Sequence, residues 1–152
     1  MGEKTVMAAG VFDILHLGHI HYLNEAKKLG DRLVVVVACD ETVRRHKHEP
    51  LMKEDMRAEM VATLKPVDEV VVGHPDDKFF TVEQVDPDII ALGYDQTHEE
   101  GAIEEELKRR GIRAEVVRME HYKDDLNGTR KIIRKIIDWH GMQKELGKVE
   151  GT

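Results

Sequence analysis

Apolar residues along this chain gather in five short runs that are separated by amphipathic segments. The runs cover residues 5–9, 33–39, 70–72, 89–92 and 114–117, and each predicts a β-strand. The run at 33–39 holds four consecutive valines, which is typical of a strand buried on both faces of a parallel sheet. Apolar residues at helical spacing predict helices over 17–29, 54–64, 79–85 and 99–110. Strands that alternate with helices predict an α/β fold, a doubly wound five-stranded parallel sheet.

The remaining segments complete the pattern. The stretch 40–51 breaks the periodicity and is predicted to be a loop. Met56 and Met60 lie at helical spacing and are expected to fill the core. Residues 1–148 are expected to form one domain, followed by a tail at 149–152. A last helix is predicted to begin at about residue 128 and to bury a stripe made of Ile132, Ile133, Ile136, Ile137 and Trp139.

Composition restricts the classes of partner. The chain has 152 residues, of which 41% are hydrophobic, and a net charge of −7. An acidic balance disfavours general nucleic-acid binding, and no run of about 18 apolar residues predicts a membrane span. The single cysteine, Cys39, closes an apolar run, where a buried thiol without a disulfide is expected. We therefore expect a cytoplasmic protein with no nucleic-acid or membrane partner.

The first predicted strand is followed by Gly-Val-Phe-Asp-Ile-Leu-His-Leu-Gly-His at residues 10–19. A helix is predicted to begin within this stretch, and the first amides of a helix favour an anion. His16 and His19 are three residues apart, so both imidazoles project to one side of the first turn and can donate to phosphate oxygens. Gly18 has no side chain to block the anion. The stretch predicts a phosphate site, although the bare histidine pair also fits an exposed helix start.

The Gly-x-Phe-Asp-x-x-His-x-Gly-His pattern at 10–19 resembles the opening motif of the cytidylyltransferase-like nucleotidyltransferases. The similarity continues through Arg57, 66–70 and 86–96 and covers the chain to about Trp139. The segment Ile-Ala-Leu-Gly-Tyr-Asp-Gln at 90–96 is most similar to the archaeal FAD synthases. The resemblance implies a Rossmann-like sheet of order 3-2-1-4-5 and transfer of AMP from ATP to FMN, which gives FAD and pyrophosphate.

Two alternatives to that activity stay open. A relative with the same opening motif would use CTP and glycerol-3-phosphate or another phosphoalcohol. A regulatory module would bind nucleotide without catalysis, because Val11 stands where the family generally has threonine and Gly128 where serine is usual.

The resemblance also implies site residues. His16 and His19 would hold the α-phosphate as catalytic residues, and Lys47 and Arg57 would position the incoming phosphate. The implied nucleotide-binding residues are Val11, Phe12, His16, Gly18, His19, Gly93, Asp95, Asn127, Thr129 and Arg130. The residues implied to bind the acceptor substrate are Asp13, Lys47, Tyr94 and Tyr122.

Some of these residues keep a second interpretation. Lys47 belongs to a basic cluster at 44–48 that also fits a solvated helix end. Arg57 follows Met56 and is expected off the buried face, either as a phosphate ligand or as a plain surface arginine. Tyr94 either stacks on a base or flavin or caps the core, and Asp95 is expected to accept from a ribose hydroxyl or an exocyclic amine.

The expected cofactor is a divalent ion, Mg²⁺ by preference, that bridges phosphate oxygens and takes few protein ligands. Histidines at 46 and 48 lack a third ligand, so no metal-binding side chain is predicted. No tightly bound organic cofactor is expected, because ATP and FMN are the substrates. Relatives in the resembled family are often homodimers, and we expect a homodimer here.

Overall fold

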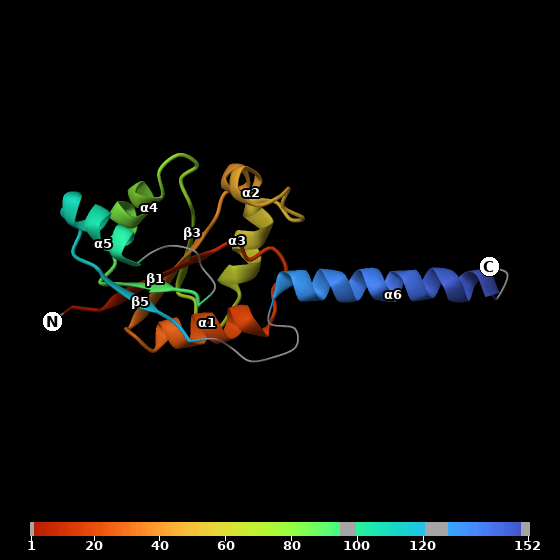
Figure 1. The fold of residues 1–152 in the computed structure, drawn as a ribbon. Helices are drawn as coiled ribbons and strands as arrows, with labels where there is room; N and C mark the ends of the chain where they lie inside the picture. Colours follow the sequence, from red (N-terminus) through yellow and green to blue (C-terminus); the bar gives the residue numbers. More distant parts are fainter. Residues whose placement is uncertain (1, 95–99, 121–127, 150–152) are drawn as a thin grey trace.

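The computed structural model describes residues 2–94, 100–120 and 128–149, which contain a five-stranded sheet (Figure 1). Neighbouring strands are parallel, and their order across the sheet is β3-β2-β1-β4-β5. The predicted sheet and strand order are confirmed. The winding direction reverses between β1 and β4, where open α/β sheets bind their ligands. The strands are β1 (Thr5–Gly10), β2 (Arg32–Val37), β3 (Glu69–Val72), β4 (Ile89–Leu92) and β5 (Glu115–Arg118).

The helices in the described ranges include one that the sequence pattern did not predict. Residues 40–46 form α2 instead of a loop, because Val43 is buried and the acidic first turn and basic last turn suit the helix dipole. None of the helices described combines the length and apolar character needed to cross a membrane. They are α1 (Leu17–Lys27), α2 (Asp40–His46), α3 (Glu54–Ala62), α4 (Lys78–Val85), α5 (Glu100–Arg109) and α6 (Thr129–Val149).

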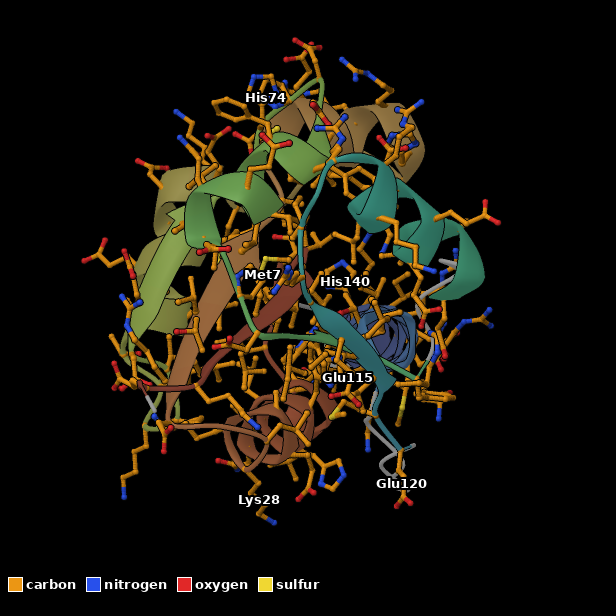
Figure 2. All side chains as sticks on the ribbon, turned by 90° about the vertical axis from the view of Figure 1, so that its left-hand side faces the viewer. Met7, Lys28, His74, Glu115, Glu120 and His140 are labelled. Carbon is orange, nitrogen blue, oxygen red and sulfur yellow. The ribbon has the colours of Figure 1, made fainter. Side chains whose placement is uncertain are left out.

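Two cores hold the layers together, one on each face of the sheet. Because side chains alternate along a strand, Val6 and Ala8 enter the first core and Met7 enters the second. Figure 2 shows the side chains that fill both layers, with Met7 labelled near the centre. Cys39 is buried as predicted. The helix residues are Leu23 and Ala26 of α1 and Val61 of α3 in the first core, and Val82 of α4 and Ile103 and Leu107 of α5 in the second.

The last helix, α6, leaves the body of the molecule (Figure 1). It begins at the side on which β1 ends and runs outward from there. Ile136, Ile137 and Trp139 are 53%, 60% and 62% exposed. The predicted burial of these three residues is therefore wrong for the single chain.

Two methionines predicted to fill the core are also exposed. Met56 and Met60 lie on the outer side of α3, where each exposes about half of its surface. The inward positions of the helix are taken by Arg57 and Val61, which are completely buried. The sequence spacing identified the helix and its buried Val61, but it placed the two methionines in the core and Arg57 outside it.

Candidate active site

The turn from β1 into α1 is closed by two histidine side chains. His16 is the N-cap of α1, and its Nδ1 accepts a hydrogen bond from the Gly18 amide at 3.1 Å. His19 Nδ1 accepts from the backbone amide of His16 at 3.3 Å, which completes a capping box. An imidazole that accepts at Nδ1 carries its proton on Nε2 when neutral. The two rings therefore each present an Nε2–H donor from the first turn of one helix.

This geometry changes the expected role of Gly18. Its amide donates to His16, so that donor serves the helix cap and not directly a phosphate. The absence of a side chain still leaves the first turn open. At this helix start, the imidazoles of His16 and His19 are therefore the groups expected to contact an anion.

The environment of His19 keeps its ring neutral. Burial, together with smaller contributions from the neighbouring His16 and Lys47, lowers the pKa of His19 from 6.5 to about 3. The His16 and His19 ring centroids are 3.8 Å apart, and the Phe12 ring lies 5.2 Å from His19. A neutral His19 donates a hydrogen bond to phosphate without carrying a full charge.

Phe12 supports His19 from a strained backbone. Its φ is +53°, in the left-handed region that side chains rarely adopt, and its ring is 2% exposed. A Cβ on Gly10 would lie 2.9 Å from Phe12 Cε2, so only glycine fits there without displacing the ring. The side chain of Phe12 is thus part of the support of the site, and a nucleotide contact through this residue stays a prediction.

Asp13 holds the loop that precedes α3. Its carboxylate accepts from the amides of Leu51 and Met52 at 2.7 and 2.9 Å, and the residue is 4% exposed. Both oxygens thus bond the loop amides, and the predicted contact of Asp13 with substrate stays a prediction. Its role here is to fix the loop beside the His16 turn.

Arg57 is completely buried, so the prediction that it lies off the buried face is wrong. Its guanidinium pairs with Asp40 at 2.7 Å. The same group donates to the carbonyls of Met52, Val11 and Ala38 at 2.9, 2.8 and 2.7 Å. Arg57 thus joins the ends of β1 and β2 to the loop before α3. These contacts give it a positioning role, and the predicted contact of Arg57 with the incoming phosphate stays a prediction.

A pocket of about 820 Å³ opens at the carboxyl ends of the strands. Lys47, the C-cap of α2, lines it together with Val11 and with Arg45 and His46. Its floor and far wall are largely apolar and come from β1, β2, α4 and α5. His74, labelled in Figure 2 at the edge of the molecule, and Phe79 belong to the lining. The pocket pairs a charged rim, which carries Asp76 and Asp77 as well as the basic residues, with an apolar interior.

Tyr22 is a site residue that sequence reasoning missed. Pairing between β1 and β4 ends at Ala8 and Ala91. Beyond that point the Tyr22 hydroxyl accepts from the Ala9 amide at 3.2 Å and donates to the Ala91 carbonyl. The hydroxyl therefore takes the place of the next ladder bond and separates the two strands where the sheet order reverses. A tyrosine among helical apolar positions gave no signal of this role.

Asp40 is a second residue that was missed, and a signal for it exists. An acidic residue directly after a buried strand, in a chain with an arginine on a neighbouring helix, is a candidate for a buried pair. The pairing itself depends on how α3 packs, which the sequence pattern does not show.

Comparison with known proteins identifies the family to which this chain belongs. A family model described as cytidylyltransferase-like matches residues 7–144. A protein named FAD synthase from Aciduliprofundum boonei is 64% identical over 134 residues, which cover 88% of this chain and 90% of that protein. The chain belongs to the cytidylyltransferase-like family.

Further relatives of this family agree in sequence and in fold. A protein named FAD synthase from Thermoplasma acidophilum is 49% identical over 136 residues, or 90% of this chain and 96% of that protein. A crystal structure from Thermoplasma volcanium, named as a lipopolysaccharide core biosynthesis protein, superposes with a TM-score of 0.79. It is 50% identical and covers 80% of this chain and all of that one.

Some of the remaining site residues that the family resemblance implies lie in the part of the chain that the structure describes, and the others do not. The Gly93 carbonyl accepts from Arg118 at 2.9 Å, and Arg118 also donates to Glu100 at 2.9 Å. Tyr94 is 51% exposed, so it does not cap the core. Thr129 and Arg130 form the first turn of α6. The predicted roles of Asp95, Tyr122 and Asn127 lie outside the described residues.

The described residues of this cytidylyltransferase-like chain contain no group of three or more His, Cys, Asp or Glu side chains that could hold a metal ion. A divalent ion in this part of the molecule therefore has no protein cage of its own. This donor set fits an ion that arrives with the phosphates of a nucleotide, since Mg²⁺ keeps most of its ligands from water and phosphate.

Proposed function

We propose that this protein transfers AMP from ATP to FMN, forming FAD and pyrophosphate, with His16 and His19 at the reacting phosphate. The observation that carries the proposal is the pair of Nε2–H donors fixed by the capping box. Gly10 and Val11 of the same turn, and Lys47, line a pocket with a largely apolar interior. The relatives named FAD synthase support the choice of substrates.

The reaction needs no covalent enzyme intermediate. A phosphate oxygen of FMN attacks the α-phosphorus of ATP, and the bond from that phosphorus to the oxygen bridging to the β-phosphorus breaks as pyrophosphate leaves in line. Negative charge grows on the α-phosphate oxygens in the transition state. His16 and His19 donate to these oxygens, and donors fixed in advance stabilise the developing charge more than the resting substrate.

Lys47 is proposed to position the phosphate of FMN. It lies on the pocket rim and is close enough to lower the pKa of His19, so its charge reaches the reacting centre. The apolar interior of the pocket suits the flavin ring, and its volume of about 820 Å³ lies in the range of small-molecule sites. Val11 lines the same pocket next to the turn.

The nucleotide is proposed to use the ends of β4 and α6. Gly93 and Tyr94 follow β4, and we assign them, with Asp95, to the nucleoside or flavin ring. Thr129 and Arg130, with Asn127, are assigned to the pyrophosphate end, where Arg130 makes a charge-assisted contact. Tyr122 stays a candidate for the acceptor.

A divalent ion bound to the ATP phosphates supplies charge neutralisation when present. The protein residues proposed here position the substrates and donate hydrogen bonds around it. A homodimer in the cytoplasm, acting without nucleic acid or membrane, completes the proposal.

The test is pyrophosphate release with Mg²⁺ for ATP and CTP, each against FMN, glycerol-3-phosphate, phosphocholine and phosphopantetheine. We expect release with ATP and FMN alone, with FAD recovered. Release with CTP and a phosphoalcohol would keep the chemistry and overturn the substrates. Nucleotide binding without release from any pair would overturn catalysis.

A further inference from the structure

Two groups of apolar side chains that a folded core would normally bury lie exposed on this chain. The first, the α6 face, consists of the exposed Ile136, Ile137 and Trp139 together with the partly buried Ile132 and Ile133. The second, the α1–α3 groove, is a hollow lined by Ile20, Asn24, Thr63, Leu64, Lys65 and Pro66. We include with it the exposed Leu17 of α1 and the exposed Met56 and Met60 of α3. We propose that the α6 face of one copy packs into the α1–α3 groove of a second copy, and reciprocally.

The α6 face is a continuous stripe. Its five residues recur at helical spacing and lie on one side of a 21-residue helix that is about 31 Å long. Polar residues such as Arg134 and Asp138 lie on the opposite side of the helical wheel. A helix that packs against nothing is marginal in water, because most helical stability comes from burying an apolar face. The α6 face therefore needs a cover.

The α1–α3 groove has the shape for such a helix. The two helices cover the same face of the sheet, and their lining residues recur at helical spacing along each. Between them lies a hollow of about 300 Å³ whose walls include Ile20, Leu64 and Pro66. Leu17, Met56 and Met60 are 55%, 50% and 49% exposed beside it. An amphipathic helix in an apolar groove is a common mode of docking, and methionines adapt to the partner.

The charges around the two surfaces are complementary. The first half of α6 carries Arg130, Lys131, Arg134 and Lys135 and no acidic residue before Asp138. The exposed surface of α3 carries Asp55 and Glu59, and its one base, Arg57, is completely buried. A basic helix beside an acidic one favours this pairing over contact between two copies of α6.

The direction of α6 favours a second copy as the occupant. The helix runs away from the body (Figure 1), so the outer part of its apolar face lies away from the groove of its own chain. A reciprocal exchange uses one helix and one groove on each copy.

This inference deepens the homodimer proposed above and rests on it, but it does not depend on the substrates. Thr129 and Arg130 begin the exchanged helix, so docking of α6 would also fix the first turn assigned to the pyrophosphate.

The test is a cross-link between two separately labelled copies. One copy, isotopically labelled, carries Met60→Cys, and the other carries Ile136→Cys. After mixing, a bismaleimide of about 10 Å span is added, and the linked peptides are identified by mass. Native Cys39 is buried, and each single variant alone measures its background. We expect a 60–136 link between labelled and unlabelled chains. In the matched control, Asp138→Cys on the polar side of α6 replaces Ile136→Cys and gives at least tenfold less product.

Sedimentation of the wild-type chain distinguishes failure of the homodimer from failure of the proposed docking site. A monomer would overturn this inference and the homodimer together. A dimer without the 60–136 link would overturn the α1–α3 groove as the docking site and leave the homodimer standing. A 60–136 link found only within one doubly substituted chain would show that α6 folds onto its own body and would also overturn the inference.

A charge exchange tests the pairing without a cross-linker. D55K/E59K should weaken dimerisation about tenfold, because like charges then face each other across two exposed pairs. Adding Lys135→Glu, at the edge of the α6 face, to the same chain should restore part of the lost affinity. If the combined variant dissociates as readily as D55K/E59K, the proposed pairing of α6 with α3 is wrong.

Discussion

The imidazole of His19 accepts a hydrogen bond from the backbone amide of His16 at 3.3 Å, while the imidazole of His16 accepts from the Gly18 amide one turn of chain away. Each ring is therefore fixed by the backbone of the turn that carries the other. The same contacts that begin α1 determine which nitrogen of each ring carries the proton. The two side chains that cap the helix are thus also the ones that we propose to recognise phosphate.

Replacement of His16 separates these two roles. Asn is a good N-cap, so His16→Asn keeps the helix start and removes the Nε2–H donor. We expect turnover to fall by about 10²- to 10³-fold, as for loss of one transition-state donor, with little change in the urea unfolding midpoint. His16→Ala loses the cap as well and should cost about 1 kcal/mol of stability. Wild-type turnover in His16→Asn would contradict the catalytic role.

Burial of His19 makes stability depend on pH. Its pKa is lowered from 6.5 to about 3 in the folded chain, chiefly by burial. Between these values the unfolded chain binds a proton at His19 that the folded chain does not, so stability falls as the pH falls. We expect the free energy of unfolding to drop by about 2 kcal/mol from pH 7 to pH 5 on account of this residue.

The measurement is urea unfolding at both pH values for the wild type and for His19→Asn. The variant should lose about 2 kcal/mol less than the wild type over this interval, because Asn does not titrate. An equal loss in both proteins, or an NMR titration of His19 near pH 6.5, would show that the ring is not kept neutral by the fold.

Replacement of Arg57 is expected to lower the stability of the fold more than it weakens substrate binding. Its charge is buried and bonded to Asp40 and to three carbonyls. Arg57→Ala leaves Asp40 without its partner and should cost about 3 to 5 kcal/mol in urea unfolding. Arg113→Ala, at an exposed position, should change stability by less than about 0.5 kcal/mol. A stable Arg57→Ala protein with a raised KM for FMN would instead indicate that Arg57 binds the phosphate of FMN.

Gly10 tests the support beneath His19. In Gly10→Ala the new Cβ would lie 2.9 Å from Phe12 Cε2 and 3.0 Å from Cζ. The ring must move, and Phe12 packs against His19, so we expect about 1 to 3 kcal/mol of destabilisation and reduced turnover. Gly101→Ala in α5 meets nothing within 4 Å and should be stabilising by about 0.5 to 1 kcal/mol. A Gly10→Ala protein as stable and active as the wild type would show that the Phe12 ring moves aside for the new Cβ without cost.

The local pattern of the sequence determined most of the elements and their order. Four consecutive valines before Cys39 identified a central strand, because a strand buried on both faces has no polar positions. Ile89 to Leu92 was predicted with the bounds that the structure has. The histidine pair was located at the start of α1 because its position follows from the strand before it and the helix after it. The strand order came from the family resemblance and not from the pattern.

Tertiary packing decided which residues face inward and what the polar ones hold. Met56 and Arg57 are adjacent on α3, and hydrophobicity alone favoured burying the methionine. The arginine is buried instead, because Asp40 and three carbonyls from distant segments meet at that point. Ile136 and Trp139 carry the signature of a buried stripe, yet both are exposed in the part of the chain that the structure describes. Periodicity reports that a face is apolar, but only the folded chain shows which surface, if any, lies against it.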